Sequence, residues 1–125
     1  MKKILACDDD EALLSLMKFK LSSPDCEVKT FSDGKKVLEY IKKEDFDLLL
    51  IDLYMPFYSG LEIISFLRNK LKSKKPVIML SAEGIDQTIT NAFSLGVDDF
   101  ITKPFSLVEL KARVTRHLSK EFTHA

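Results

Sequence analysis

The sequence predicts an α/β fold, namely one doubly wound sheet of five parallel strands in the order 2-1-3-4-5 with five helices. Five short apolar segments alternate along the chain with five segments in which apolar residues recur at helical spacing. No internal repeat or interior linker interrupts this alternation. A chain of 125 residues suits a single domain with a real core.

The first part of the chain predicts two strands and two helices. Residues 3–7 form a short apolar strand, and the acidic run 8–11 after it suits the first turn of a helix. Residues 26–31 alternate in polarity and predict a strand nearer the edge of the sheet. Asp33-Gly34 begins the second helix. The inner faces of the two helices are expected to carry Leu13, Leu14, Met17 and Leu21, then Val37, Leu38 and Ile41.

Residues 47–52 form an apolar run that ends on Asp52, and a loop containing Pro56 follows at once. A run that is apolar on every position is typical of a central parallel strand covered on both faces. Gly60 then begins the third helix. Its expected inner face consists of Leu61, Ile64, Leu67 and Leu71.

The last part of the chain predicts two strands and two helices. Residues 76–80 form a strand that ends on Ser81, and residues 98–102 form a strand that ends on Lys103-Pro104. The helix between them should stop near Gly96, a good residue for a helix end. Its inner face is expected to include Ile85, Ile89, Ala92 and Phe93. The final helix has a capping box from Ser106 to Glu109, a Phe105–Leu110 staple and a buried stripe of Leu107, Leu110, Val114 and Leu118.

Composition excludes several classes of protein. Lysine plus arginine equals aspartate plus glutamate, 19 each, so the chain lacks the basic excess of a typical nucleic-acid binder. No apolar run reaches the roughly 20 residues that span a bilayer. Residues 1–4 lead straight into a strand, without the apolar core of a signal peptide. We therefore expect a cytoplasmic protein that does not interact with membranes.

The cysteines and histidines predict neither a disulfide nor a histidine metal site. Cys7 ends the first strand and Cys26 begins the second, so in a parallel pair they lie about 13 Å apart at about 3.3 Å per residue. That separation exceeds the roughly 7 Å limit for a disulfide. The two histidines, His117 and His124, both lie near the C-terminus.

Chemically useful side chains follow the predicted strands. In the order 2-1-3-4-5 the carboxyl ends of the strands bring together Asp8, Asp9, Asp52, Ser81 and Lys103. Carboxylates this crowded disfavour joint ionisation, so the group must bind a cation or shift its pKa values. An all-oxygen site suits Mg²⁺, with Mn²⁺ as an alternative. Taken singly, each residue has a structural explanation as a first-turn residue, an N-cap or a surface cation. Their joint position favours a functional site.

The sequence resembles the receiver domain of bacterial two-component response regulators over nearly its whole length. The segments that carry this resemblance are 4–10, 50–56 with Gly60, 80–82 and 100–105. The resemblance implies that Asp52 accepts a phosphoryl group from the phosphohistidine of a sensor histidine kinase. It implies that Lys103 contacts this group and that Ser81 donates a hydrogen bond to it. It further implies a Mg²⁺ site made of Asp9, Asp52 and the backbone carbonyl of Tyr54, with Asp8 acting through water, and a cis Lys103–Pro104 peptide.

The resemblance also implies an output surface. Ser81 and Phe100 are expected to switch together, with Phe100 standing where many relatives carry tyrosine. Residues 96–106 and 109–114 are similar to the OmpR/PhoB subfamily of transcription factors, whose receivers dimerise on phosphorylation through the fourth helix, fifth strand and fifth helix. The expected dimer face consists of Asp98, Asp99, Glu109, Arg113 and Arg116. Ile89 departs from the subfamily because that position is often basic.

The sequence also bears on the lifetime of the phosphoryl group and on three other functions. Tyr54 and Glu83 lie two residues beyond Asp52 and Ser81, where they are expected to flank the site and affect the lifetime of the phosphoryl group. A Mg²⁺-dependent aspartyl-phosphate phosphatase would need a carboxylate at Tyr54. A flavin or nucleotide carrier of the flavodoxin-like fold would need a glycine-rich loop after the first strand. An inert receiver-like module does not explain the complete set of site residues.

The expected domain organisation is a receiver over residues 1–121, followed by a tail or the start of a linker at 122–125. We expect a protein that catalyses only its own phosphorylation and dephosphorylation. Its output is expected to be homodimerisation or an attached or separate effector, with no direct nucleic-acid binding by this domain. A stand-alone receiver that binds a partner protein is the alternative.

Overall fold

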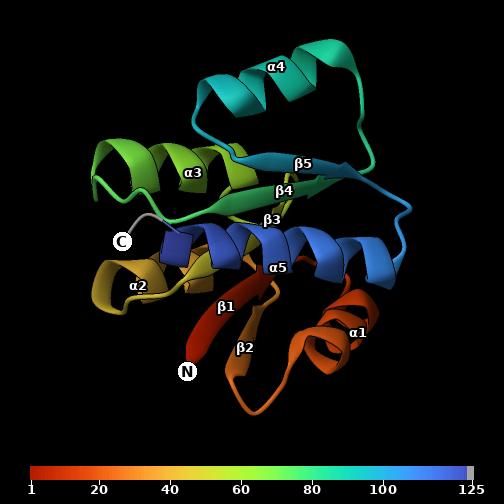
Figure 1. Ribbon diagram of the computed structural model, residues 1–125. Helices are drawn as coiled ribbons and strands as arrows, with labels where there is room; N and C mark the ends of the chain where they lie inside the picture. Colours follow the sequence, from red (N-terminus) through yellow and green to blue (C-terminus); the bar gives the residue numbers. More distant parts are fainter. Residues whose placement is uncertain (124–125) are drawn as a thin grey trace.

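The computed structural model describes residues 1–123, with side chains described through Ser119. Five strands and five helices alternate along the chain in three layers (Figure 1). The strands are β1 (Lys2–Cys7), β2 (Cys26–Phe31), β3 (Leu48–Asp52), β4 (Val77–Ser81) and β5 (Asp99–Thr102). The helices are α1 (Glu11–Leu21), α2 (Gly34–Lys43), α3 (Gly60–Asn69), α4 (Asp86–Ser94) and α5 (Leu107–Thr123).

The sheet has the order β2-β1-β3-β4-β5, and every neighbouring pair is parallel. The predicted topology is therefore confirmed, with strand limits that differ from the expected ones by one residue at most. The register places Asp52 opposite Leu80 and Ser81 opposite Thr102. The ends of β3, β4 and β5 thus lie side by side at one edge of the sheet.

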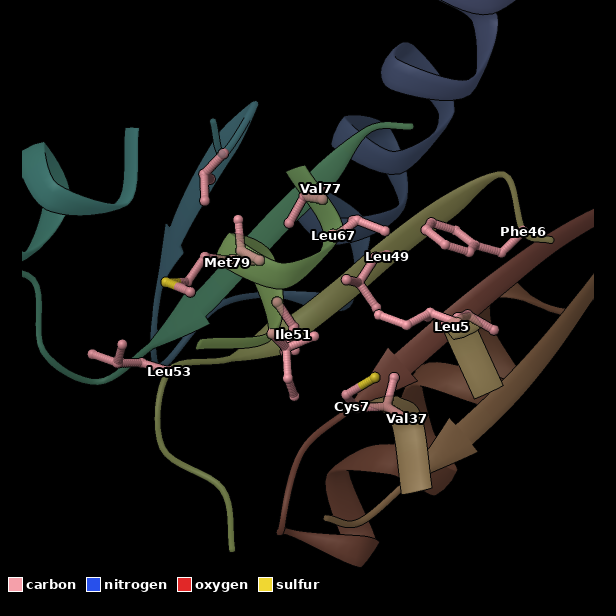
Figure 2. Close-up of a cluster of buried hydrophobic side chains, with 14 of the residues drawn as sticks. Leu5, Cys7, Val37, Phe46, Leu49, Ile51, Leu53, Leu67, Val77 and Met79 are labelled. Atoms are coloured by element: carbon pink, nitrogen blue, oxygen red, sulfur yellow. The ribbon is translucent and has the colours of Figure 1, made fainter. Parts of the chain in front are cut away.

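Both faces of the sheet are covered, because alternate residues of the central strands point to opposite sides. On one face Leu5, Leu49, Ile51 and Met79 pack with side chains from α2, α3 and α4 (Figure 2). On the other face Ile4, Leu50 and Leu80 pack with α1 and α5. All five residues of β3 are buried, as expected for a central strand.

Four helices begin at residues whose side chains cap them, and at α5 the predicted cap Ser106 accepts a hydrogen bond from Glu109 N at 3.0 Å. Asp10 and Asp33 accept hydrogen bonds from Leu13 N and Lys36 N, so α1 starts only after Asp8 and Asp9. Ser59 and Glu62 form a reciprocal capping box at α3. Because α1 begins at Glu11, Asp8 and Asp9 stay in the loop at the edge of the sheet rather than in a helical turn.

The expected inner faces of α3 and α4 were partly wrong. Leu71 lies beyond the end of α3 and is exposed, whereas Ile63 is buried. On α4 the buried residues are Thr88 and Ala92, while Ile85 is 58% and Phe93 46% exposed. The apolar side chains of residues 85–93 therefore do not all face the sheet, because the smaller Thr88 and Ala92 occupy the positions against it.

Cys7 and Cys26 are free, and Cys26 pairs with Lys2 at the opposite end of β1 from Cys7, as predicted. Helix α5 continues through Thr123, so the boundary expected between residues 121 and 122 stays a prediction. Residues 124–125 lie outside the described chain. No helix within residues 1–123 is both long enough and apolar enough to cross a membrane.

Candidate functional site

Three aspartates meet at the carboxyl ends of β1 and β3. Carboxylate oxygens of Asp8, Asp9 and Asp52 all lie within 4.8 Å of one another. Asp8 is fully buried and accepts a hydrogen bond from Asp10 N at 2.9 Å, whereas Asp9 is exposed and Asp52 is 8% exposed. The site therefore combines a fixed buried carboxylate with two that solvent reaches.

Backbone hydrogen bonds of the neighbouring residue Leu53 fix the position of Asp52 in this site. Leu53 N donates to Leu80 O at 3.1 Å, and Gly60 N donates to Leu53 O at 2.8 Å. A Cβ atom on Gly60 would collide with the backbone oxygen of Asp52, so only glycine lets α3 start this close to β3. The first residue of α3 thus fixes the backbone that carries the Asp52 carboxylate.

Lys103 reaches the aspartates from the end of β5. Its Nζ lies 2.6 Å from Asp8 Oδ2 and 3.4 Å from Asp52 Oδ2. Its backbone N donates to Ser81 O at 2.7 Å, and the following Lys103–Pro104 peptide is cis, as the resemblance implied. The sheet edge therefore brings Asp8, Asp9, Asp52 and Lys103 into one site, which we call the acidic pocket, and Ser81 lies beside Lys103 at the end of β4.

The charges in the pocket perturb two pKa values. Burial, reinforced by the Asp8 carboxylate, raises the pKa of Asp52, and Lys103 opposes this shift. Burial lowers the pKa of Lys103, but its hydrogen bond to Asp8 and the charges of Asp8 and Asp52 outweigh it, so the net direction is upward. Lys103 therefore stays protonated beside a pocket whose negative charge it neutralises only in part.

The donor set fits a hard divalent cation. Three carboxylates supply only oxygen ligands, and Mg²⁺ binds such groups while keeping several waters. Three carboxyl groups face the single ammonium group of Lys103, and burial, followed by the charge of Asp8, raises the pKa of Asp52, so negative charge is in excess at this position. A cation at Asp8, Asp9 and Asp52 would relieve that excess.

Ser81 ends β4 and is 1% exposed. Its Oγ accepts a hydrogen bond from Glu83 N at 3.0 Å, a local turn contact rather than an N-cap, because α4 begins at Asp86. Glu83 also contacts Tyr54, whose hydroxyl lies 2.6 Å from Glu83 Oε2. The two rim positions noted in the sequence are thus hydrogen-bonded to each other.

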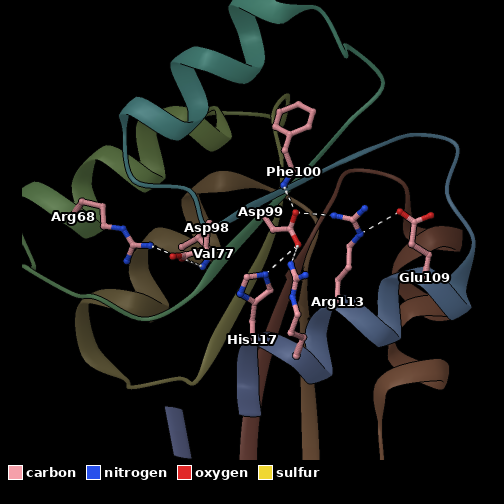
Figure 3. Close-up of polar contacts among 9 residues, drawn as sticks. Arg68, Val77, Asp98, Asp99, Phe100, Glu109, Arg113 and His117 are labelled. Atoms are coloured by element: carbon pink, nitrogen blue, oxygen red, sulfur yellow. Dashed lines mark hydrogen bonds and ion pairs between the residues drawn. The ribbon is translucent and has the colours of Figure 1, made fainter. Parts of the chain in front are cut away.

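Asp99 is the centre of a polar cluster between β5 and α5 (Figure 3). Its Oδ1 lies 2.8 Å from Arg113 Nη1, and its Oδ2 lies 3.1 Å from His117 Nε2 and 3.2 Å from Arg116 Nη2. Its Oδ1 also accepts a hydrogen bond from Phe100 N at 2.9 Å. Asp99, Arg113 and Arg116, expected at a dimer face, therefore pair within one chain.

The other expected dimer residues also have intrachain partners. Glu109 lies 3.2 Å from Arg113 Nε, one turn away on α5. Asp98 accepts hydrogen bonds from Val77 N at 2.8 Å and from Arg68 at 3.0 Å. Phe100, expected to switch with Ser81, is partly buried, and Figure 3 shows its ring on the side of β5 away from His117.

Sequence reasoning did not find three of these contacts. Thr88 and His117 are polar residues on faces expected to be apolar, and their partners Glu83 and Asp99 come from other elements. Arg68 lies near the end of α3, and nothing in its sequence context pointed to Asp98. Of these residues, only Glu83 was indicated by the sequence, because it lies two residues beyond Ser81.

Comparison with known proteins gives consistent results. Residues 4–115 match the family model of the response regulator receiver domain. The chain is 38% identical over 119 residues to the nisin biosynthesis regulatory protein NisR of Lactococcus lactis subsp. lactis, covering 95% of this chain and 51% of NisR. It is 37% identical over 113 residues to the alkaline phosphatase synthesis transcriptional regulatory protein PhoP of Bacillus subtilis, covering 90% and 47%.

Among solved structures, the chain is similar to the response regulator DrrB of Thermotoga maritima, an OmpR/PhoB homologue. The TM-score is 0.87 with 36% identity, covering 97% of this chain and 54% of DrrB. The chain therefore spans about half the length of these regulators.

Proposed function

The chain belongs to the response regulator receiver domain family, and from this premise we propose that it is a signalling switch activated by phosphorylation of Asp52. The observation that carries the proposal is the convergence of Asp8, Asp9, Asp52 and Lys103 at one edge of the sheet. The proposed phosphoryl donor is the phosphohistidine of a sensor histidine kinase.

The proposed reaction is attack of an Asp52 carboxylate oxygen on the phosphorus atom. A P–O bond forms, the P–N bond to the donor histidine breaks, and its electron pair returns to the imidazole. The carboxylate attacks in its ionised form, so no general base is required. Lys103 Nζ, which lies 3.4 Å from Asp52, is positioned to offset negative charge on the transferred group.

Asp9, Asp52 and the backbone carbonyl of Tyr54 are the proposed ligands of Mg²⁺, with Asp8 acting through water and Mn²⁺ as a possible replacement. When bound, the cation supplies charge neutralisation for the phosphoryl oxygens. The chain's own contribution is the placement of the carboxylates: Asp8 is fixed by its buried position, by Asp10 N and by Lys103.

The proposed output runs from Ser81 to the surface of α4, β5 and α5. Ser81 would donate a hydrogen bond to a phosphoryl oxygen, and Phe100 would change its position with it. The resulting surface would control homodimerisation or an effector, and transcriptional control is favoured because PhoP is a transcriptional regulatory protein. A cytoplasmic location and the absence of direct nucleic-acid binding by this domain belong to the same proposal.

A stand-alone receiver that binds a separate partner protein is the second candidate for the output. A phosphatase acting on other substrates is disfavoured, because the residue two positions after Asp52 is Tyr54 rather than a carboxylate. In the proposed function the chain therefore acts on its own phosphoryl group and not on an external substrate.

The experiment is phosphorylation of the chain by acetyl phosphate with Mg²⁺, followed by intact-mass measurement. We expect one phosphoryl group on the wild type and none on Asp52→Asn. Asp45→Asn, which changes an exposed aspartate, is the matched control and should be labelled like the wild type. Equal labelling of Asp52→Asn would refute the site, and an unlabelled wild type would refute the proposed function.

A further inference from the structure

Three side chains from separate segments meet at the rim of the pocket. Tyr54, in the loop after β3, donates its hydroxyl to Glu83 Oε2 at 2.6 Å. Thr88, in the first turn of α4, donates its hydroxyl to Glu83 Oε1 at 2.9 Å. We call this set the Glu83 bridge, because one carboxylate joins the β3–α3 loop to α4.

The Glu83 bridge is also connected to Ser81. The backbone N of Glu83 donates to Ser81 Oγ at 3.0 Å, so the residue that carries the bridging carboxylate also holds the serine hydroxyl oxygen. Tyr54 lies two residues after Asp52, and Glu83 two residues after Ser81. The contacts therefore span the ends of β3 and β4 just beyond the proposed phosphoacceptor.

The Glu83 bridge consists of two hydrogen bonds from hydroxyl groups to one carboxylate. The hydrogen bond from Tyr54, followed by that from Thr88, lowers the pKa of Glu83 and keeps its carboxylate ionised. Each carboxylate oxygen thus accepts a charge-assisted hydrogen bond, which is shorter and stronger than a hydrogen bond between neutral groups. Thr88 is 9% exposed and anchors the inner end, whereas Tyr54 is 60% exposed.

We propose that the Glu83 bridge is a latch that opposes movement of the β4–α4 loop and the first turn of α4 toward a phosphoryl group on Asp52. The inference rests on the proposed function, because Ser81 must follow that group for the signal to leave the pocket. Ser81 Oγ can move toward that group only by breaking its hydrogen bond to Glu83 N or by taking Glu83 with it, and the Glu83 carboxylate is held on both sides. A restraint present in one conformation and lost in another biases the equilibrium toward the first.

Removing the Tyr54 hydroxyl tests the latch. We expect Tyr54→Phe to bind beryllofluoride, a mimic of the phosphoryl group, about 2- to 10-fold more tightly than the wild type in the presence of Mg²⁺, the range for one exposed hydrogen bond. Tyr54→Phe keeps the backbone and the ring, so the exposed site tolerates it. Tyr58→Phe makes the same chemical change in the same loop outside the bridge and should leave the affinity unchanged.

The second variant, Thr88→Val, breaks the other half of the bridge while keeping the shape of the side chain. If both halves act through Glu83, the effect of the double variant is smaller than the product of the single effects. Thr90→Val, at an exposed position of α4, is the control. Multiplicative effects would refute the shared role of Glu83.

Nuclear magnetic resonance separates a latch from a merely structural contact. In Tyr54→Phe without beryllofluoride, the amide signals of residues 85–93 should move part of the way toward their positions in the beryllofluoride-bound wild type. Unchanged signals with unchanged affinity, or weaker binding of beryllofluoride, would overturn the latch while the wild type still binds. A wild type that neither binds beryllofluoride nor accepts a phosphoryl group would overturn the proposed function itself.

Discussion

Lys103 forms ion pairs with two aspartates, since its Nζ lies 2.6 Å from Asp8 Oδ2 and 3.4 Å from Asp52 Oδ2. In the proposed function its positive charge would offset negative charge on a phosphoryl group carried by Asp52, and the same charge would compete with a metal ion for the carboxylates. Lys103→Met should therefore separate the two effects. We expect phosphorylation by acetyl phosphate to slow by about 100-fold, the cost of losing one preorganised electrostatic contact.

In the same variant the affinity for Mg²⁺ should be equal to or higher than that of the wild type, because a repelling charge has gone. Titration calorimetry measures the affinity, and intact mass measures the rate. Lys29→Met, an exposed lysine on β2, is the control for the loss of charge. A large loss of Mg²⁺ affinity would show that Lys103 organises the carboxylates rather than contacting the phosphoryl group.

Arg68 is a residue whose role is structural. Its guanidinium donates to the backbone oxygens of Gly96, Ser73 and Lys75 at 2.7–3.1 Å, in addition to the Asp98 carboxylate. Gly96 has φ of +104°, a conformation that favours glycine, and presents its carbonyl to this guanidinium. One side chain thus joins the end of α3 to the loops before β4 and β5.

Arg68→Ala should lower the free energy of unfolding by about 2–3 kcal/mol, because several backbone carbonyls lose a charged donor. Arg116→Ala, which removes a side chain that is 61% exposed, should cost under about 1 kcal/mol. Urea denaturation followed by circular dichroism measures both. Equal losses in the two variants would contradict the structural role of Arg68.

The polar contacts between β5 and α5 are centred on the Asp99 carboxylate. Asp99 is largely withdrawn from solvent by burial, which raises its pKa, but its hydrogen bonds to His117 and Phe100 N and the charge of Arg113 prevail, so the pKa is lowered. A lowered folded pKa contributes stability that is present above the ordinary value of 3.8 and is lost as the pH falls below it.

Asp99→Asn should therefore lose about 1–2 kcal/mol of unfolding free energy at neutral pH and show a shallower decline in stability below about pH 4 than the wild type. Urea denaturation at a series of pH values tests this difference. Asp45→Asn, at an exposed position, should keep the steep acid decline. Parallel pH profiles for the wild type and Asp99→Asn would exclude the Asp99 cluster as the cause.

The strands, the helices and the acidic pocket could be predicted from local sequence patterns, whereas side-chain contacts such as Arg68–Asp98 could not. Apolar runs and strand-end polar residues predicted all five strands and the edge where Asp8, Asp52 and Lys103 meet, since a parallel sheet brings those ends together. The phase of α4 was wrong because its apolar side chains and its small ones lie on different faces. Choosing between those faces requires knowing how closely the helix approaches the sheet.

Helix α4 presents exposed apolar side chains and packs beside β5. Ile85 and Phe93 are 58% and 46% exposed, and Ile89 between them is partly exposed. The ionic residues nearby are already paired within the chain, notably Asp99 with Arg113. For the proposed dimer on this face, apolar burial should therefore contribute more than ion pairs across the interface.

Beryllofluoride with Mg²⁺ should convert the chain from monomer to dimer, as measured by sedimentation velocity. Each substitution occurs twice in a two-fold dimer. Phe93→Ala should therefore raise the dissociation constant of the dimer by at least about tenfold through lost apolar burial. Arg116→Ala should weaken it by less than about tenfold, because exposed ion pairs contribute little. A greater effect of Arg116→Ala would indicate an interface of ion pairs. A chain that stays monomeric with beryllofluoride bound would refute the proposed dimer and favour output through a partner protein or an attached effector.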